Sequence, residues 1–157
     1  MINHFKSVLK LALACALLGG CMATPEATPA DDASAKLFES APGAAIVYLY
    51  RADPPGTSVV DLWMDGRPVG ESLPGTYFRV PVRPGKNLIT AGTADAGRLE
   101  LTTLGGEVYF VAISNTAIDG GFGSQFKMVP PESGRAAILR CCNRLDTWKP
   151  GQNRVPL

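Results

Sequence analysis

Short apolar runs and polar breaks follow one another along the chain from residue 44 to residue 130. The stretch AIVYLYR is rich in β-branched and aromatic residues, and Phe78, Val80 and Val82 fall on alternate positions. A period of two residues is typical of strands that bury one face. The runs recur about every ten residues without a long helical period between them. We therefore predict a mainly all-β fold, a small antiparallel β-sandwich-like domain of about seven or eight short strands.

Turn-forming dipeptides separate the predicted strands. Asp65-Gly66 lies between two apolar runs, and Asp-Gly there favours a two-residue hairpin turn because both residues tolerate positive φ. The segment PESGRAAILRCC, residues 131–142, predicts a short C-terminal helix with a proline and a glutamate near its start. The candidate core residues are apolar and lie on the predicted strands: Val47, Leu49, Leu62, Phe78, Val80, Val82, Leu88, Phe110 and Ala112.

Residues 1–20 have the three zones of a signal peptide. His4, Lys6 and Lys10 form a positively charged start, residues 11–18 are apolar, and Gly19 and Gly20 are small, as a cleavage site requires. A membrane-spanning helix needs about 20 apolar residues, so this apolar stretch is too short for a stable span. We predict a signal peptide over residues 1–20.

The sequence Leu18-Gly19-Gly20-Cys21 resembles the bacterial lipobox, in which a cysteine after two small residues is acylated at the cleavage site. The resemblance implies a covalent lipid on Cys21, and several acyl chains hold a protein firmly because each buried methylene contributes about 0.8 kcal/mol. In lipoprotein sorting, an Asp directly after the acylated cysteine favours retention in the inner membrane, and this chain has Met22 there. We therefore expect a lipid-anchored protein of the bacterial cell envelope, in the outer membrane and facing the periplasm. The alternative is an ordinary secretory signal that is cut and discarded.

The stretch after Cys21 differs in composition from the β-rich body. Residues 22–35, MATPEATPADDASA, contain no large aliphatic or aromatic side chain apart from Met22 and repeat Ala-Thr-Pro. Such a segment buries too little apolar surface to fold on its own. We predict a flexible tether over residues 21–43, a β-domain over residues 44–142 and a loose C-terminal tail over residues 143–157.

Four sequence elements follow one another in the β-rich body: Tyr-x-Tyr-Arg, Asp-Gly-x-x-x-Gly, Gly-Thr-Tyr-Phe and Pro-Gly-Lys-Asn. With them, residues 44–139 resemble the bacterial predicted-lipoprotein family called domain of unknown function 2846, which is similar to short PEGA-type β-domains of bacterial surfaces. The sequence departs from that family at Asn87, where a histidine is common. The resemblance implies a β-fold at the cell envelope and brings no established activity.

The chain has a single histidine, His4, which lies in the predicted signal peptide. A mature chain without imidazole lacks the Ser-His-Asp and Cys-His arrangements of nucleophilic catalysis and the commonest metal ligand. We therefore expect no catalytic residue, no metal site and no cofactor other than the lipid on Cys21. The net charge is +1 and no basic block occurs, which argues against a nucleic-acid partner.

Four side chains are candidates for contact with a ligand or a protein partner. Arg51 follows the Tyr-x-Tyr pair, where a guanidinium could hold an anionic group or simply pair with an acid. Trp63 and Tyr77 could offer flat platforms to a glycan. Phe122 lies in the Gly-rich stretch DGGFGSQ, which is either a binding loop or a connector.

Carboxylates offer an alternative catalytic chemistry. Asp61 and Asp65 flank Leu-Trp-Met, and Glu71 and Asp95 lie in or near predicted turns. Two converging carboxyl groups beside an aromatic side chain can hydrolyse glycans. The simpler interpretation is that Asp65 shapes its turn and Asp61 faces solvent.

Cys141 and Cys142 are adjacent, which leaves three alternatives in an oxidising compartment. Neighbouring Cα atoms lie about 3.8 Å apart across a trans peptide, closer than most disulfides allow, so a vicinal disulfide would be strained. The others are cross-links to a second chain and two buried thiols. A redox role of the pair is a further alternative.

The sequence thus predicts a membrane-anchored envelope lipoprotein that acts as a non-enzymatic binding or structural module. Its expected partners are the lipid bilayer, through acylated Cys21, and an envelope protein or a glycan. One alternative is a carboxylate-based envelope hydrolase that acts on glycans. Another is an accessory subunit of an envelope complex, with an open sheet edge that receives a partner strand.

Overall fold

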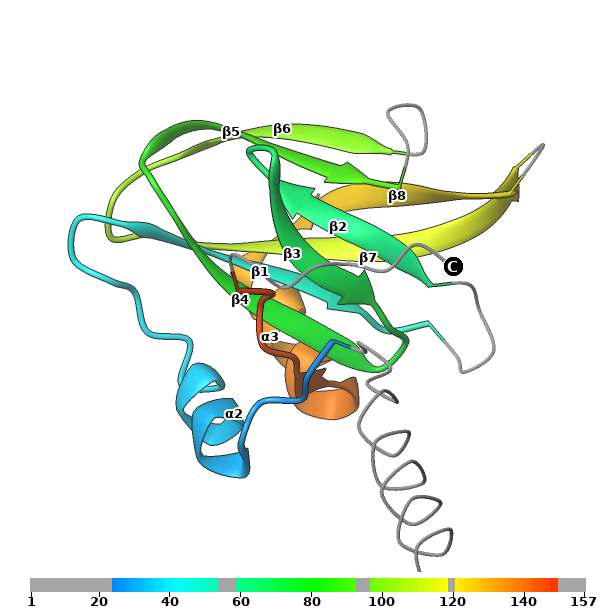
Figure 1. The fold of residues 1–157 in the computed structure, drawn as a ribbon. Helices are drawn as coiled ribbons and strands as arrows, with labels where there is room; N and C mark the ends of the chain where they lie inside the picture. Colours follow the sequence, from blue (N-terminus) through cyan, green and yellow to red (C-terminus); the bar gives the residue numbers. More distant parts are fainter. Residues whose placement is uncertain (1–23, 54–58, 93–96, 119–120, 150–157) are drawn as a thin grey trace, which may run out of the picture.

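The computed structural model describes residues 24–53, 59–92, 97–118 and 121–149, so the predicted signal peptide and Cys21 lie outside it (Figure 1). The described residues form two sheets, with the strand orders β8-β7-β1-β4-β9 and β3-β2-β5-β6. The five-stranded sheet contains β1 (Ala45–Arg51), β4 (Thr76–Val82), β7 (Val108–Ile118), β8 (Gly121–Val129) and β9 (Asn143–Arg144). The four-stranded sheet contains β2 (Val60–Met64), β3 (Arg67–Ser72), β5 (Gly85–Ala91) and β6 (Arg98–Thr103). Two helices are α2 (Pro29–Ala35) and α3 (Pro131–Cys141).

The predicted fold class is confirmed: the chain is mainly β, with two sheets and a short C-terminal helix. Most neighbouring strands are antiparallel, but β1 pairs with β7 and β4 pairs with β9 in parallel. Parallel neighbours need a long connection. Here the chain between β1 and β7 builds β4 and the whole four-stranded sheet, so no local pattern indicates this pairing.

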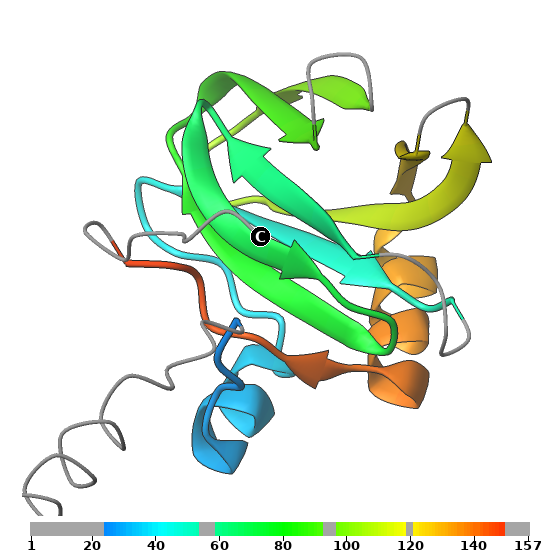
Figure 2. The same cartoon turned by 45° about the vertical axis from the view of Figure 1, so that its right-hand side comes forward.

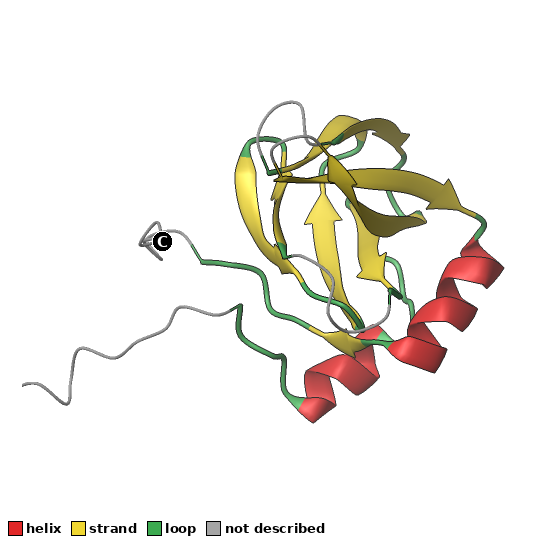
Figure 3. Ribbon diagram, turned by 90° about the vertical axis from the view of Figure 1, so that its right-hand side faces the viewer, coloured by secondary structure: helices red, strands yellow, loops and turns green. Residues whose placement is uncertain are grey.

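The five-stranded sheet has a hydrophobic cluster on each face. Val47 and Leu49 of β1 point between the sheets and pack in the main core. Ile46, Tyr48 and Tyr50 point the other way, into a second cluster under α2 and α3. Both helices lie on this outer side of the sheet (Figure 2 and Figure 3). Every residue of β1 is therefore buried, which explains its continuous apolar run.

The alternation in β5 has the opposite phase to the predicted one. Leu88 is only half-buried, whereas Ile89 and Ala91 are in the main core. Asn87 also points inward, and its amide nitrogen donates hydrogen bonds to the carbonyl of Gly85 and to Thr103 Oγ1. The interior accepts this polar side chain because its donors are satisfied. A period of two residues does not show which of the two faces is buried, and the prediction of Leu88 as a core residue is wrong.

The segment predicted as a flexible tether is packed against the domain from Thr24 on. Thr24 is 4% exposed, and its hydroxyl accepts a hydrogen bond of 2.8 Å from the backbone of Glu71 in β3. Glu26 forms a bridge with Leu145. Helix α2 is too short to be stable alone, but it covers the aromatic face of the sheet, where Phe38 is also buried. The segment needs few apolar residues of its own because the sheet supplies the surface.

The predicted loose tail is also packed at its start. Asn143 and Arg144 form β9 beside β4, and Leu145 is 1% exposed in the main core. Further along, the backbone nitrogen of Trp148 donates a hydrogen bond of 2.9 Å to the carbonyl of Val69. Strand β9 extends the five-stranded sheet, and the bond to Val69 fastens the tail to β3, so the tail gains structure from its neighbours.

Candidate functional site

Arg51, a predicted ligand contact, is a buried structural residue. Its side chain is 1% exposed at the end of β1. The guanidinium donates to Asp53 Oδ2 at 3.1 Å and to the carbonyl of Ser72 at 2.8 Å. Asp53 in turn accepts a hydrogen bond from the backbone of Asn115. Arg51 therefore joins β1 to the end of β3 and to β7, and the ligand interpretation is wrong because the guanidinium is enclosed.

The other three predicted contacts do not come together. Tyr77 is 0% exposed and belongs to the cluster under α2, so it offers no platform to a glycan. Trp63 is half-buried in β2, where it pairs with Pro68 and Thr90 across the outer face of the four-stranded sheet. Phe122 lies in β8, opposite Ala117 of β7, so residues 121–125 form a strand and not the predicted loop. The side chain of Phe122 lies outside the described residues.

Two of the four candidate catalytic carboxylates accept hydrogen bonds from backbone groups. Asp65, in the hairpin turn with φ of 52°, accepts a hydrogen bond of 2.7 Å from the backbone of Leu88. Glu71 accepts hydrogen bonds from the backbone and the hydroxyl of Thr24. Asp61 is the cross-strand neighbour of Glu71, and Asp95 lies outside the described residues. Hairpin geometry thus accounts for Asp65, as the simpler interpretation predicted.

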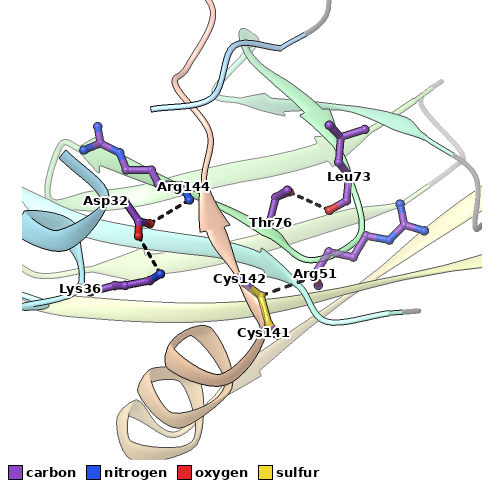
Figure 4. The surroundings of a disulfide bond; sticks show 8 residues. All are labelled: Asp32, Lys36, Arg51, Leu73, Thr76, Cys141, Cys142 and Arg144. Atoms are coloured by element: carbon purple, nitrogen blue, oxygen red, sulfur yellow. Dashed lines mark hydrogen bonds and ion pairs between the residues drawn. A yellow bond between two sulfur atoms is a disulfide. The ribbon is translucent and has the colours of Figure 1, made fainter. Parts of the chain in front are cut away.

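A polar cluster fastens α2 to the sheet. Asp32 Oδ1 accepts a hydrogen bond of 2.9 Å from the Tyr77 hydroxyl. It also accepts one of 2.9 Å from the backbone of Arg144, and Lys36 lies 2.8 Å from Oδ2 (Figure 4). Partial burial disfavours the charged carboxylate, but the hydrogen bonds from Lys36, Tyr77 and Arg144 outweigh it, and the pKa of Asp32 is lowered. The pKa of Tyr77 is raised, mainly by burial and to a smaller extent by its hydrogen bond to Asp32. Asp32 therefore stabilises the docked helix as an anion.

Asp32→Asn is expected to lower the free energy of unfolding by about 1 kcal/mol at pH 7, because a charged acceptor is lost from a half-buried cluster. The pKa of Asp32 is lower in the folded state, so its contribution is present above the unfolded value of about 3.9 and disappears as the pH falls through the folded value. Urea unfolding at pH 7 and at about pH 3 measures the difference.

Asp31→Asn is the matched control on the same helix, since Asp31 is exposed and Asn still accepts from Thr28. We expect this control to change the free energy of unfolding by less than about 0.5 kcal/mol. Equal losses for Asp32→Asn at both pH values would contradict the role of the charge.

Cys141 and Cys142 form a vicinal disulfide at the end of α3 (Figure 4). Cys141 is exposed, whereas Cys142 is buried with its sulfur 3.8 Å from the carbonyl oxygen of Arg51. Of the three alternatives left by the sequence, the structure contains the intramolecular one. The disulfide lies where the chain leaves the helix for β9, against the buried end of β1.

A groove of about 850 Å³ lies where β3 and β4 meet at one side of the sandwich. Its floor is apolar, formed by buried side chains that point between the sheets, and its wall is the C-terminal segment with Thr147 and Trp148. The floor residues are Met64, Val69, Val80 and Val82. On the other side of the sandwich β6 packs against β8, where Gly97 meets the Ser124 carbonyl. The groove therefore lies at one edge of the main core.

Three exposed cations surround the groove, and we call them the basic rim: Arg67, Arg83 and Lys86. None of their side chains has a hydrogen bond or an ion pair within the part of the chain that the structure describes. The lining contains one acid, Asp65, whose Oδ1 already holds the Leu88 backbone. The groove thus combines an apolar floor with an excess of positive charge.

Sequence reasoning did not single out the basic rim. Arg67 follows the Asp-Gly hairpin turn, and Arg83 and Lys86 enclose Pro-Gly in the turn that leads from β4 to β5, in the other sheet. The basic residues at both turns were visible, but nothing local shows that the two turns lie side by side. Trp148 was assigned to a loose tail, so its contact with Val69 was also missed.

No helix among the described residues is long and apolar enough to cross a membrane. The same part of the chain contains no group of three or more His, Cys, Asp or Glu placed to hold a metal ion.

Comparison with known proteins adds one relative and no function. No protein-family model matches the chain. The chain is 29% identical over 138 residues to an uncharacterized protein of Haemophilus influenzae, and the alignment covers 85% of this chain and 80% of the relative. Since no family model matches, the resemblance to domain of unknown function 2846 stays a prediction.

Proposed function

We propose that the chain is a lipid-anchored protein of a bacterial envelope whose β-domain is a non-enzymatic binding module held directly at the membrane surface. Leu18-Gly19-Gly20-Cys21 supports the anchor, and the resemblance to a predicted-lipoprotein family points to the same location. The absence of histidine after His4 supports a binding role. The module's partner is an envelope component reached from the outer membrane, on its periplasmic face.

The packing of the N-terminal segment is the observation that carries this proposal. Thr24 follows Cys21 by three residues and is already buried against β3. Three extended residues span at most about 10 Å. Acyl chains on Cys21 would therefore hold the edge of the sandwich at the bilayer, without the slack that a flexible tether gives.

Acylation of Cys21 can be tested with Cys21→Ser and with Cys15→Ser as the matched control, since both cysteines lie near the cleavage site. The full chain is expressed in bacteria that are fed radiolabelled palmitate, and inner and outer membranes are separated on a density gradient. We expect the wild type and Cys15→Ser to carry label in the outer membrane and Cys21→Ser to carry none. Equal labelling of Cys21→Ser would overturn the anchor.

A further inference from the structure

The groove beside β3 has the features of a site for an anionic amphiphile. Phosphate groups are held well by arginine and lysine that are not already paired, and the basic rim supplies three such side chains. The floor is formed by buried aliphatic side chains such as Val80 and Val82. A small inorganic anion would use the basic rim and leave this floor uncovered, whereas an amphiphile covers both.

Trp148 gives the wall of the groove the character of a membrane interface. Its side chain is half-buried along the groove, with its backbone fixed to Val69 at 2.9 Å. Tryptophan is enriched where headgroups meet hydrocarbon, because its ring is large and apolar while its N–H is polar. The basic rim and this ring together suit the boundary between a phosphate and its glycerol and acyl chains.

The groove begins close to the proposed anchor. Thr24 is bonded to Glu71, and Val69, two residues along β3, is bonded to Trp148 in the groove wall. Two residues of a strand span about 7 Å, and the chain from Cys21 to Thr24 spans at most about 10 Å. The headgroup layer on each side of a bilayer is itself about 5–8 Å thick. The groove therefore lies within reach of the headgroups around the anchor.

We propose that this groove binds the headgroup of an anionic phospholipid from the membrane that holds Cys21. The phosphate lies on the basic rim, and the glycerol backbone that carries the acyl chains lies against the apolar floor and Trp148. This inference rests on the proposed lipid anchor. According to this inference, the ligand of the binding module is a lipid of the membrane in which the protein is anchored.

The test uses the full chain as purified from bacterial membranes and reconstituted into phosphatidylcholine nanodiscs. Trp63→Phe leaves Trp148 as the single tryptophan, since the chain contains two. Dibrominated phosphatidylglycerol or dibrominated phosphatidylcholine is then added at the same mole fraction, and quenching of Trp148 fluorescence is measured. We expect dibrominated phosphatidylglycerol to quench at least about twofold more strongly than dibrominated phosphatidylcholine, because basic side chains near a bilayer enrich anionic lipids.

The triple variant R67Q/R83Q/K86Q is expected to remove this difference. The control R98Q/K127Q/R140Q removes the same charge from exposed positions outside the groove and is expected to keep it. Thermal melts of the variants show whether each is folded. If the triple variant does not fold, Arg83→Gln alone replaces it and is expected to reduce the difference in quenching between the two lipids. Equal quenching by the two lipids, or equal loss in the control, would overturn the site.

Two further outcomes separate the alternatives. Inorganic phosphate at millimolar concentration is expected to leave the quenching unchanged, and reversal by phosphate would show a phosphate site with no lipid component. Co-elution of the protein with nanodiscs reports the anchor independently of the quenching. A chain that fails to co-elute would overturn the anchor and, with it, the membrane as the source of the ligand.

Discussion

Arg51→Met is expected to lower the free energy of unfolding by about 3 kcal/mol, the largest loss for a single residue that we anticipate. Removing one partner of a buried ion pair typically costs about 3–5 kcal/mol, because the other charge and its neighbours lose their partner. Asp53 is 25% exposed, so water can hydrate the remaining carboxylate and the loss falls at the lower end of that range. The Ser72 carbonyl also loses its 2.8 Å donor.

Urea unfolding at neutral pH measures this loss, with Arg98→Met as the matched control. Arg98 also pairs with an acid, Glu100, but both side chains are more than half exposed. Exposed ion pairs contribute little, so the control is expected to change stability by less than about 0.5 kcal/mol. If Arg51→Met costs no more than Arg98→Met, the guanidinium does not hold the strands together as described.

Gly134→Ala is expected to lower the free energy of unfolding by about 2 kcal/mol, although alanine is the better helix former. A Cβ at Gly134 would overlap Cβ and Cγ of Phe110 and fall 2.6 Å from Cδ1. Phe110 is 0% exposed and stacks on Tyr48 at 5.2 Å, so the ring has little room to move. Overpacking costs about 1–3 kcal/mol or more, and the helix propensity of alanine returns at most about 1 kcal/mol.

Ser133→Ala tests helix propensity alone, because Ser133 is exposed on the same helix. We expect it to leave stability unchanged or slightly raised, by less than about 0.5 kcal/mol. Denaturant unfolding of the two variants compares the effects directly. Stability equal to or above that of the wild type for Gly134→Ala would mean that α3 can move away from the sheet at little cost.

Local patterns predicted the strands and their turns well. Asp65 and Gly66 have positive φ, 52° and 73°, as the Asp-Gly hairpin requires. The alternation of Phe78, Val80 and Val82 also places these three side chains in the main core. These features depend on residues that are neighbours in the chain, and a short window of sequence contains all the relevant chemistry.

Features that join distant segments were not predictable in the same way. Helix α2 packs because Tyr48, Tyr77 and Phe110 form one aromatic face, and these residues come from three strands. The local sequence around Arg51 is compatible with an anion site. Its enclosure depends on the ends of other strands, which are distant in the chain. The basic rim likewise depends on the β2–β3 hairpin turn lying beside the turn that crosses from β4 to β5. In each case tertiary contacts decide the role of a residue whose local sequence permits several.

The docking of the N-terminal segment has a mechanical consequence. A pull from Cys21 reaches the described part of the fold at Thr24, where the load meets the hydrogen bonds between Thr24 and Glu71 of β3, the Glu26–Leu145 bridge and the small helix α2. These attachments would peel away one after another while both sheets stay intact. Fully extended, the freed residues 24–43 would span roughly 65 Å. The segment would then act as a releasable spacer, short at rest and long under tension.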